Sequence, residues 1–164
     1  MARAARDLRG PLLVPHSPDL PTQVIDVRDL ASWLLDRAAA GTTGVFDAVG
    51  PILPFGCWIE QSRQAAGHTG PVLQADPDWL LDHGVAPWMG PDSLPMWLAG
   101  GPESWPVFSG LAARSAGLTH RRRPDMLADL LGWERGQGLD RERPAGLGPA
   151  KERELIDALT SVVR

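Results

Sequence analysis

The residues from Pro21 to Pro51 constrain the fold most, because a strand-like, a helix-like and a second strand-like pattern follow one another there. Polar and apolar residues alternate from Gln23 to Val27, which predicts a half-buried strand. An apolar stripe at helical spacing comes next. It predicts a helix that buries Leu30, Ala31, Leu34, Leu35 and Ala38.

Both ends of this expected helix carry matching signals. Asp26 or Asp29 can accept hydrogen bonds from the free amides of the first turn, and Gly41 suits the left-handed backbone that ends a helix. The apolar run from Val45 to Val49 predicts a second strand, covered on both faces. A strand, a helix and a strand of these lengths predict a right-handed crossover in a parallel sheet.

The phrases QVIDVRDLASWLLD and GTTGVFDAVGP resemble the carboxyl-terminal half of the extended short-chain dehydrogenases. The nearest group is the NAD-dependent epimerase/dehydratase-like reductases common in actinobacteria. Asp29 and Leu30 match that family's Val-x-Asp-Leu-type turn, and Phe46 matches its Gly-Val-Tyr/Phe-Asn strand. Asp47 departs from the usual Asn of that strand.

The resemblance covers nearly all of the 164 residues. It implies an α/β fold that corresponds to the substrate domain, with a small parallel sheet and flanking helices and without the N-terminal Rossmann half. The expected organisation is a single truncated substrate-binding domain. It comprises an extended segment over residues 1–22, an α/β core over 23–135, a linker over 136–148 and a C-terminal helix over 149–164.

Caps and breakers predict the remaining elements. These are helices over 55–66, 76–83, 110–116 and 125–135, a strand over 72–75, and the last helix with Leu155, Ile156, Leu159, Val162 and Val163 on its buried side. The stripe of the 125–135 helix contains Met126, Leu127, Leu130, Leu131 and Trp133. Cys57, next to Trp58 near a helix start, is expected to lie in the core.

The segment from Ala86 to Trp105 has neither a helical nor a strand period and is rich in proline, so it predicts a long structured loop. Its three tryptophans admit two interpretations. Either the indoles close the core, or, by analogy with the resembled family, they line a substrate pocket. On the second interpretation the substrate-binding residues are Trp88, Trp97 and Trp105, together with Gln23.

Charge and hydropathy exclude several partners. The formal net charge is −4 and the only basic run is Arg121 to Arg123, so binding to nucleic acid is not expected. We interpret that run as a solvated turn, with contact to an anionic substrate group as the alternative. The sequence contains no secretory signal and no apolar stretch of membrane-spanning length, so we expect a cytoplasmic protein.

The residues that would carry reductase chemistry are missing from the sequence. The resembled family binds its dinucleotide on a Gly-x-x-Gly-x-x-Gly turn and donates a proton from a tyrosine four residues before a lysine. This chain has no such turn, no tyrosine and a single lysine, Lys151. No histidine pair predicts a metal site. His83 is the one candidate general base, although its place in the last helical turn equally suits the helix dipole.

Three functions therefore stand as hypotheses. The chain is the substrate-binding portion of an epimerase/dehydratase-like protein, with NAD(P) only where a partner supplies the Rossmann half. Alternatively it is a cofactor-independent enzyme such as a cyclase or isomerase, or it is a non-catalytic ligand-binding or interaction module. In the resembled fold the strand from Val45 to Val49 pairs with the dinucleotide-binding sheet. The resemblance therefore implies a homodimer or a partner chain that covers this edge.

Overall fold

The computed structural model describes residues 1–100 and 105–161, and within them it has an α/β fold with seven helices and three small sheets of paired strands. The helices are α1 (Ala2–Arg6), α2 (Val27–Ala39), α3 (Phe55–Ala66), α4 (Pro77–Asp82), α5 (Leu111–Ser115), α6 (Arg123–Gln137) and α7 (Pro149–Ser161). The strands are β1 (Leu12–Pro15), β2 (Pro21–Gln23), β3 (Ile52–Pro54), β4 (Val72–Ala75), β5 (Ala86–Pro87) and β6 (Ser93–Leu94).

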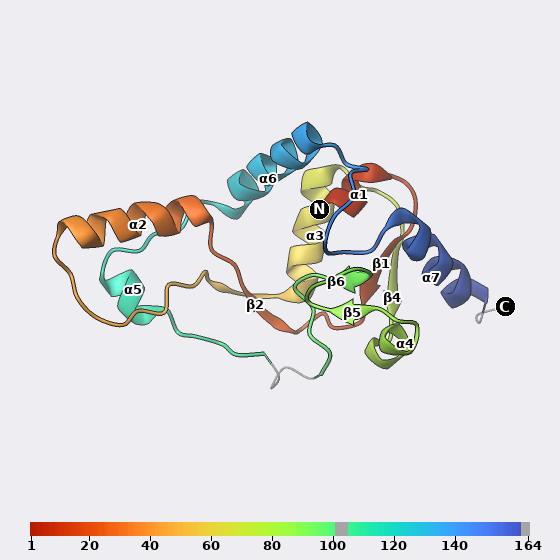
Figure 1. Cartoon of the computed structure of the whole chain (residues 1–164), viewed down its shortest axis with the longest axis horizontal. Coiled ribbons are helices and arrows are strands. Elements are labelled where there is room, and N and C mark those ends of the chain that lie inside the picture. Colours follow the sequence, from red (N-terminus) through yellow and green to blue (C-terminus); the bar gives the residue numbers. More distant parts are fainter. Residues whose placement is uncertain (101–104, 162–164) are drawn as a thin grey trace.

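The central sheet consists of β1 and β4, which run parallel with Leu13 opposite Leu73. All four residues of β1 are buried, because α1 and α3 lie beside this sheet and α7 packs on β1 (Figure 1). Phe55, Leu80 and Trp97 share the largest buried apolar cluster with Leu13. The sequence predicts β4, but β1 lies in a segment expected only to be extended.

The predicted parallel crossover between two adjacent strands is wrong. Strand β2 pairs with β3 in the antiparallel direction, with Gln23 opposite Ile52. Within the described residues no strand covers Val45 to Val49, and Val45 is 96% exposed. Gly50 permits close backbone contact just before the ladder, since a Cβ at this position would lie 1.7 Å from the Val24 carbonyl oxygen. The two chain segments meet there backbone to backbone, and the ladder forms only beyond that contact.

Helix α2 begins where the sequence predicts but buries a different face. The Asp26 carboxylate accepts a hydrogen bond from the Arg28 amide at 2.9 Å and caps the helix, and Gly41 follows its end at φ 63°. Trp33 is the buried residue, whereas Leu34 and Leu35 of the predicted stripe are exposed. The Trp33 indole donates to the Ala116 carbonyl at 3.0 Å, so the packing partner selects this face.

Two parts of the molecule are distinguishable in Figure 1. Helices α2 and α5 lie together at one end, where Trp33, Ala113 and Leu118 form a small buried cluster of their own. We call this part, residues 24–50 and 106–122, the outer lobe, and the remainder the main body. The antiparallel β2–β3 ribbon connects them. The outer lobe therefore has a thin core and a large surface.

Other predictions of local structure are confirmed or corrected individually. Helix α3 spans the predicted residues, and Gly67 ends it at φ 77°. Cys57 is exposed and not in the core, because α3 turns Phe55 and Trp58 inward instead. Leu130 and Trp133 of the predicted α6 stripe are also exposed, since only Leu127 and Leu131 of that helix are buried. Val162 and Val163 lie outside the described residues.

The arginine run is internally paired. Arg121 donates to Asp29 from Nε at 2.9 Å and from Nη2 at 2.8 Å, and lies 3.3 Å from Asp26. Arg122 pairs with Asp125, and the guanidinium of Arg123 lies 5.4 Å from the centre of the Trp58 ring. Arg121 and Arg123 are thus held by structural contacts, whereas the Arg122 side chain is 81% exposed, as expected for a solvated turn.

This ion-pair group makes stability depend on acid pH. Hydrogen bonds from Arg28 lower the pKa of Asp26 to about 2, and those from Arg121 lower the pKa of Asp29. An aspartate carboxyl in the unfolded chain has a pKa of about 4. The ion pairs therefore stabilise the folded state fully above that pH, and this stabilisation is lost as the pH falls from about 4 towards 2. The difference in free energy of unfolding between wild type and Asp29→Asn, from urea titrations, should shrink across this range. A constant difference would contradict the assignment.

Candidate functional site

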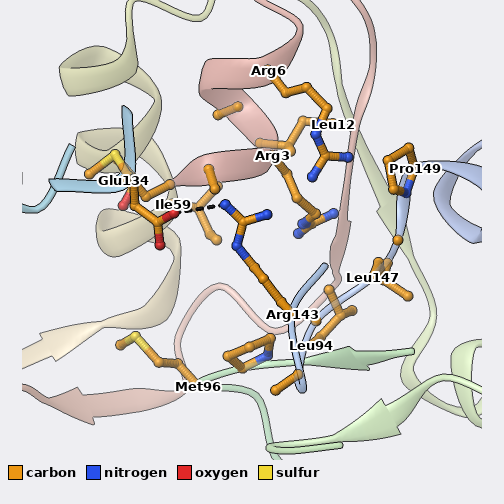
Figure 2. Close-up of a pocket in the computed structure, with 18 of the residues that line it drawn as sticks. Arg3, Arg6, Leu12, Ile59, Leu94, Met96, Glu134, Arg143, Leu147 and Pro149 are labelled. Atoms are coloured by element: carbon orange, nitrogen blue, oxygen red, sulfur yellow. Dashed lines mark hydrogen bonds and ion pairs between the residues drawn. The ribbon is translucent and has the colours of Figure 1, made fainter. Parts of the chain in front are cut away.

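The described residues enclose a cavity of about 600 Å³ in the main body. Its walls come from α1, α3, the last turns of α6 and the segment 138–149 that leads to α7 (Figure 2). Drug-sized ligands occupy sites of about 300–1,000 Å³ in proteins, so this volume suits a small organic molecule. The cavity is therefore the candidate binding site.

Much of the cavity wall is apolar, because it lies where β1 and α3 meet the loop around β6. Leu12 of β1 and Ile59 of α3 lie on one side, and Leu94 and Met96 on another. Leu147 closes the wall from the segment before α7. These side chains offer a ligand dispersion contacts and a dry surface.

Arginine side chains bring positive charge into this apolar setting. Arg143 Nη2 donates to Glu134 at 2.7 Å (Figure 2), and Arg141 Nη1 donates to the same carboxylate oxygen at 2.6 Å. Burial favours a raised pKa for the Glu134 carboxyl, but these two hydrogen bonds outweigh it and hold that pKa below its ordinary value. One carboxylate thus serves two guanidinium groups.

Helix α1 supplies two further arginines, which face different environments. Arg3 donates to the Leu13 carbonyl at 2.9 Å and to Glu152 at 2.5 Å, so its charge is matched. Arg6 Nε lies 3.4 Å from Asp140, whose side chain is 82% exposed to solvent. The Nε atoms of Arg6 and Arg143 are buried, and within residues 1–100 and 105–161 neither donates a hydrogen bond. Arg6 forms no other hydrogen bond within those residues, so its Nη groups retain donor capacity at the cavity.

Gln23, a predicted substrate-binding residue, lies away from the cavity and fastens two loops to each other. Its Nε2 donates to the carbonyls of Gly50 at 3.0 Å and Phe108 at 2.8 Å, while its Oε1 accepts from the Phe108 amide at 2.9 Å. These bonds occupy both ends of the side-chain amide. The structure therefore gives Gln23 a positioning role at the start of the outer lobe.

The three tryptophans of the loop do not gather around one cavity. Trp97 is fully buried in the main core, which favours the core interpretation for this residue. Trp88 is 45% exposed, and its ring centre lies 5.4 Å from that of Trp105. The loop does reach the cavity, through Leu94 and Met96 instead. Residues 101–104 of the loop lie outside the described residues.

His83, the candidate general base, is engaged at the end of α4. Its Nδ1 donates to the Trp79 carbonyl at 2.8 Å, and its ring stacks on the Trp79 ring with centres 3.8 Å apart. It does not line the cavity. These contacts account for the residue as a helix-ending group.

The cavity arginines were not among the predicted site residues. A signal for the first pair exists in the sequence, since Arg3 and Arg6 are three apart and share a face of α1. No local pattern links them to Glu134, Arg141 or Arg143, which lie far along the chain. Folding of the chain brings these residues into the wall of one cavity.

Comparison with protein-family models, curated proteins and solved structures finds no match to this chain. Among the described residues, no three histidine, cysteine or acidic side chains are grouped so that they could hold a metal ion. No helix in that same part of the chain has the length and apolar character to cross a bilayer.

Proposed function

We propose that this chain is the small-molecule-binding portion of an epimerase/dehydratase-like protein and that a partner polypeptide supplies the dinucleotide-binding half. The observation that carries the proposal is the combination, in one small chain, of a ligand-sized cavity and an outer lobe covered with exposed apolar side chains. We assign the cavity to ligand binding and the exposed apolar side chains of the outer lobe to partner binding.

The outer lobe has more exposed apolar surface than its own packing requires. Leu35 is 72% exposed and Val27 is 73% exposed. Further large apolar side chains are exposed on the same lobe, namely Leu34, Val45, Val107, Phe108 and Leu111. Such an accumulation marks an association surface in soluble proteins. The partner surface we propose is this one, which includes Val45, instead of a bare strand edge.

The sequence supports the division of labour between two chains. It contains neither the glycine-rich turn nor the tyrosine that the resembled family uses with its coenzyme. A partner that binds NAD(P) would bring the reactive nicotinamide, and this chain would bind and orient the substrate. The exposed outer lobe supports this proposal over the cofactor-independent alternatives, since a chain that acts alone needs no association surface.

Purification of the tagged protein from its native cells tests the proposal. We expect an assembly with a second polypeptide that binds NADPH, measured by energy transfer from tryptophan to the nicotinamide. Leu35→Glu should weaken assembly by about tenfold or more, because it places a charge where the proposed interface with the partner buries an apolar side chain. Leu81→Glu, at a 40% exposed leucine of the main body, is the matched control and should assemble normally. A monomer, or an assembly without affinity for NADPH, would overturn the proposal.

A further inference from the structure

We infer that the cavity selects an amphipathic monoanion, a molecule with an apolar body and one carboxylate or sulfonate group, which the guanidinium group of Arg6 binds. The inference rests on the proposed function, since it names the ligand class of the same cavity. It depends on three observations: the unused donors, the unequal charge pairing and the apolar walls.

The unused donors are the first observation. A buried N–H group without an acceptor destabilises the folded protein, so proteins rarely leave one unpaired. Here Arg6 and Arg143 each have a buried Nε in that condition, and both residues line the same cavity. The other nitrogen atoms of Arg143 are already committed, to Glu134 and to the carbonyls of Leu139 and Arg141. The accessible nitrogen atoms that remain are the Nη groups of Arg6, to which the described residues offer no hydrogen-bond acceptor, and an oxyanion in the cavity would supply one.

The unequal charge pairing is the second observation. Glu134 is shared between Arg141 and Arg143, and the carboxylate nearest Arg6 belongs to the largely exposed Asp140. An exposed pair at this distance contributes little. Arg3 is matched by the buried Glu152 and Arg143 by Glu134, so Arg6 is the arginine of the cavity with the weakest pairing. A ligand anion would complete the pairing.

Two more carboxylates limit how much negative charge the ligand can carry. Asp92 and Glu142 also line the cavity, and within the described residues neither pairs with an arginine. They would repel a dianion such as a phosphate monoester more strongly than a monoanion. The apolar side chains of Leu12, Ile59 and Met96 in turn favour a ligand with a hydrocarbon or aromatic body.

Two fluorescent probes that share one ring skeleton test the inference in the purified wild-type chain. The anion is 8-anilinonaphthalene-1-sulfonate, and N-phenyl-1-naphthylamine is its neutral counterpart. We expect both to bind, with the anion bound more tightly. Arg6→Gln should weaken binding of the anion by about tenfold and leave the neutral probe unchanged, because only the anion uses the charge-assisted hydrogen bond. Arg9→Gln, at an exposed arginine outside the cavity, is the matched control.

Ser62→Trp, which fills the cavity from α3, tests whether the probes bind inside the cavity. It should abolish binding of both, with the folded state verified by circular dichroism. Decanoate should displace the anionic probe at concentrations where decan-1-ol does not. Equal binding of the two probes, or an Arg6→Gln variant with unchanged affinity for the anion, would overturn the inference and leave the proposed function intact. Failure of both probes and of decanoate to bind would overturn the ligand-binding role itself.

Discussion

Trp97→Ala is expected to lower the free energy of unfolding by about 3–5 kcal/mol, which is the cost of removing a large aromatic side chain from a packed core. Trp97 has no exposed surface and packs in the cluster that contains Leu13, Phe55 and Leu80. Urea titration followed by circular dichroism measures the change. A chain of this size has a total stability of about 5–15 kcal/mol, so the variant should be close to unfolding.

Two control variants sharpen this expectation. Trp88→Ala, at the 45% exposed indole of the same loop, should change stability by less than about 1 kcal/mol. Trp97→Phe should be milder than the alanine variant, because the buried indole Nε1 has no acceptor within the described residues and loses no hydrogen bond. A Trp97→Ala protein with the wild-type urea midpoint and no ligand binding would instead restore this residue to the substrate site.

Glu152→Ala is expected to lower the free energy of unfolding by about 3–5 kcal/mol, the usual cost of leaving one partner of a buried ion pair uncompensated. The Glu152 carboxylate is 2.5 Å from Arg3 Nη1 and also accepts from the Leu13 amide at 3.4 Å. Its loss removes the ion pair between α7 and α1 and a hydrogen bond to β1. Thermal unfolding by differential scanning calorimetry measures this effect.

The neighbouring pair in α7 provides the comparison. Lys151 and Glu154 are 2.8 Å apart, but the Glu154 side chain is 64% exposed, so Glu154→Ala should cost less than about 1 kcal/mol. A double variant, Arg3→Met with Glu152→Leu, should recover most of the lost stability, since it leaves no unpaired buried charge. Equal losses for Glu152→Ala and Glu154→Ala would show that the Arg3 pair is not a buried anchor.

Local structure could be predicted from the sequence because its causes are local. Helix α3 starts after Pro54 and ends at Gly67, and α4 starts at the Asp76 cap, as the residues themselves indicate. These positions act through the amides of the first turn and through left-handed backbone, so no distant residue takes part.

Strand pairing could not be predicted in the same way. The run from Val45 to Val49 has the composition of a buried strand, yet within the described residues it forms no ladder. A strand requires a partner, and β2 pairs with β3 and not with residues 45–49. Trp33 was missed as the core residue of α2 for a similar reason, since only the arrival of α5 decides which helix face is covered.

The sequence by itself determined the helices with clear caps, the low net charge and the lack of tyrosine, because each is a property of composition or of neighbouring residues. The tertiary structure alone decided the direction of strand pairing and the candidate site. That site joins Arg3 and Arg6 of the first helix to Glu134 and Arg143 near the end of the chain. Residues so far apart in sequence come together only when burial of the apolar core brings distant segments of the chain into contact.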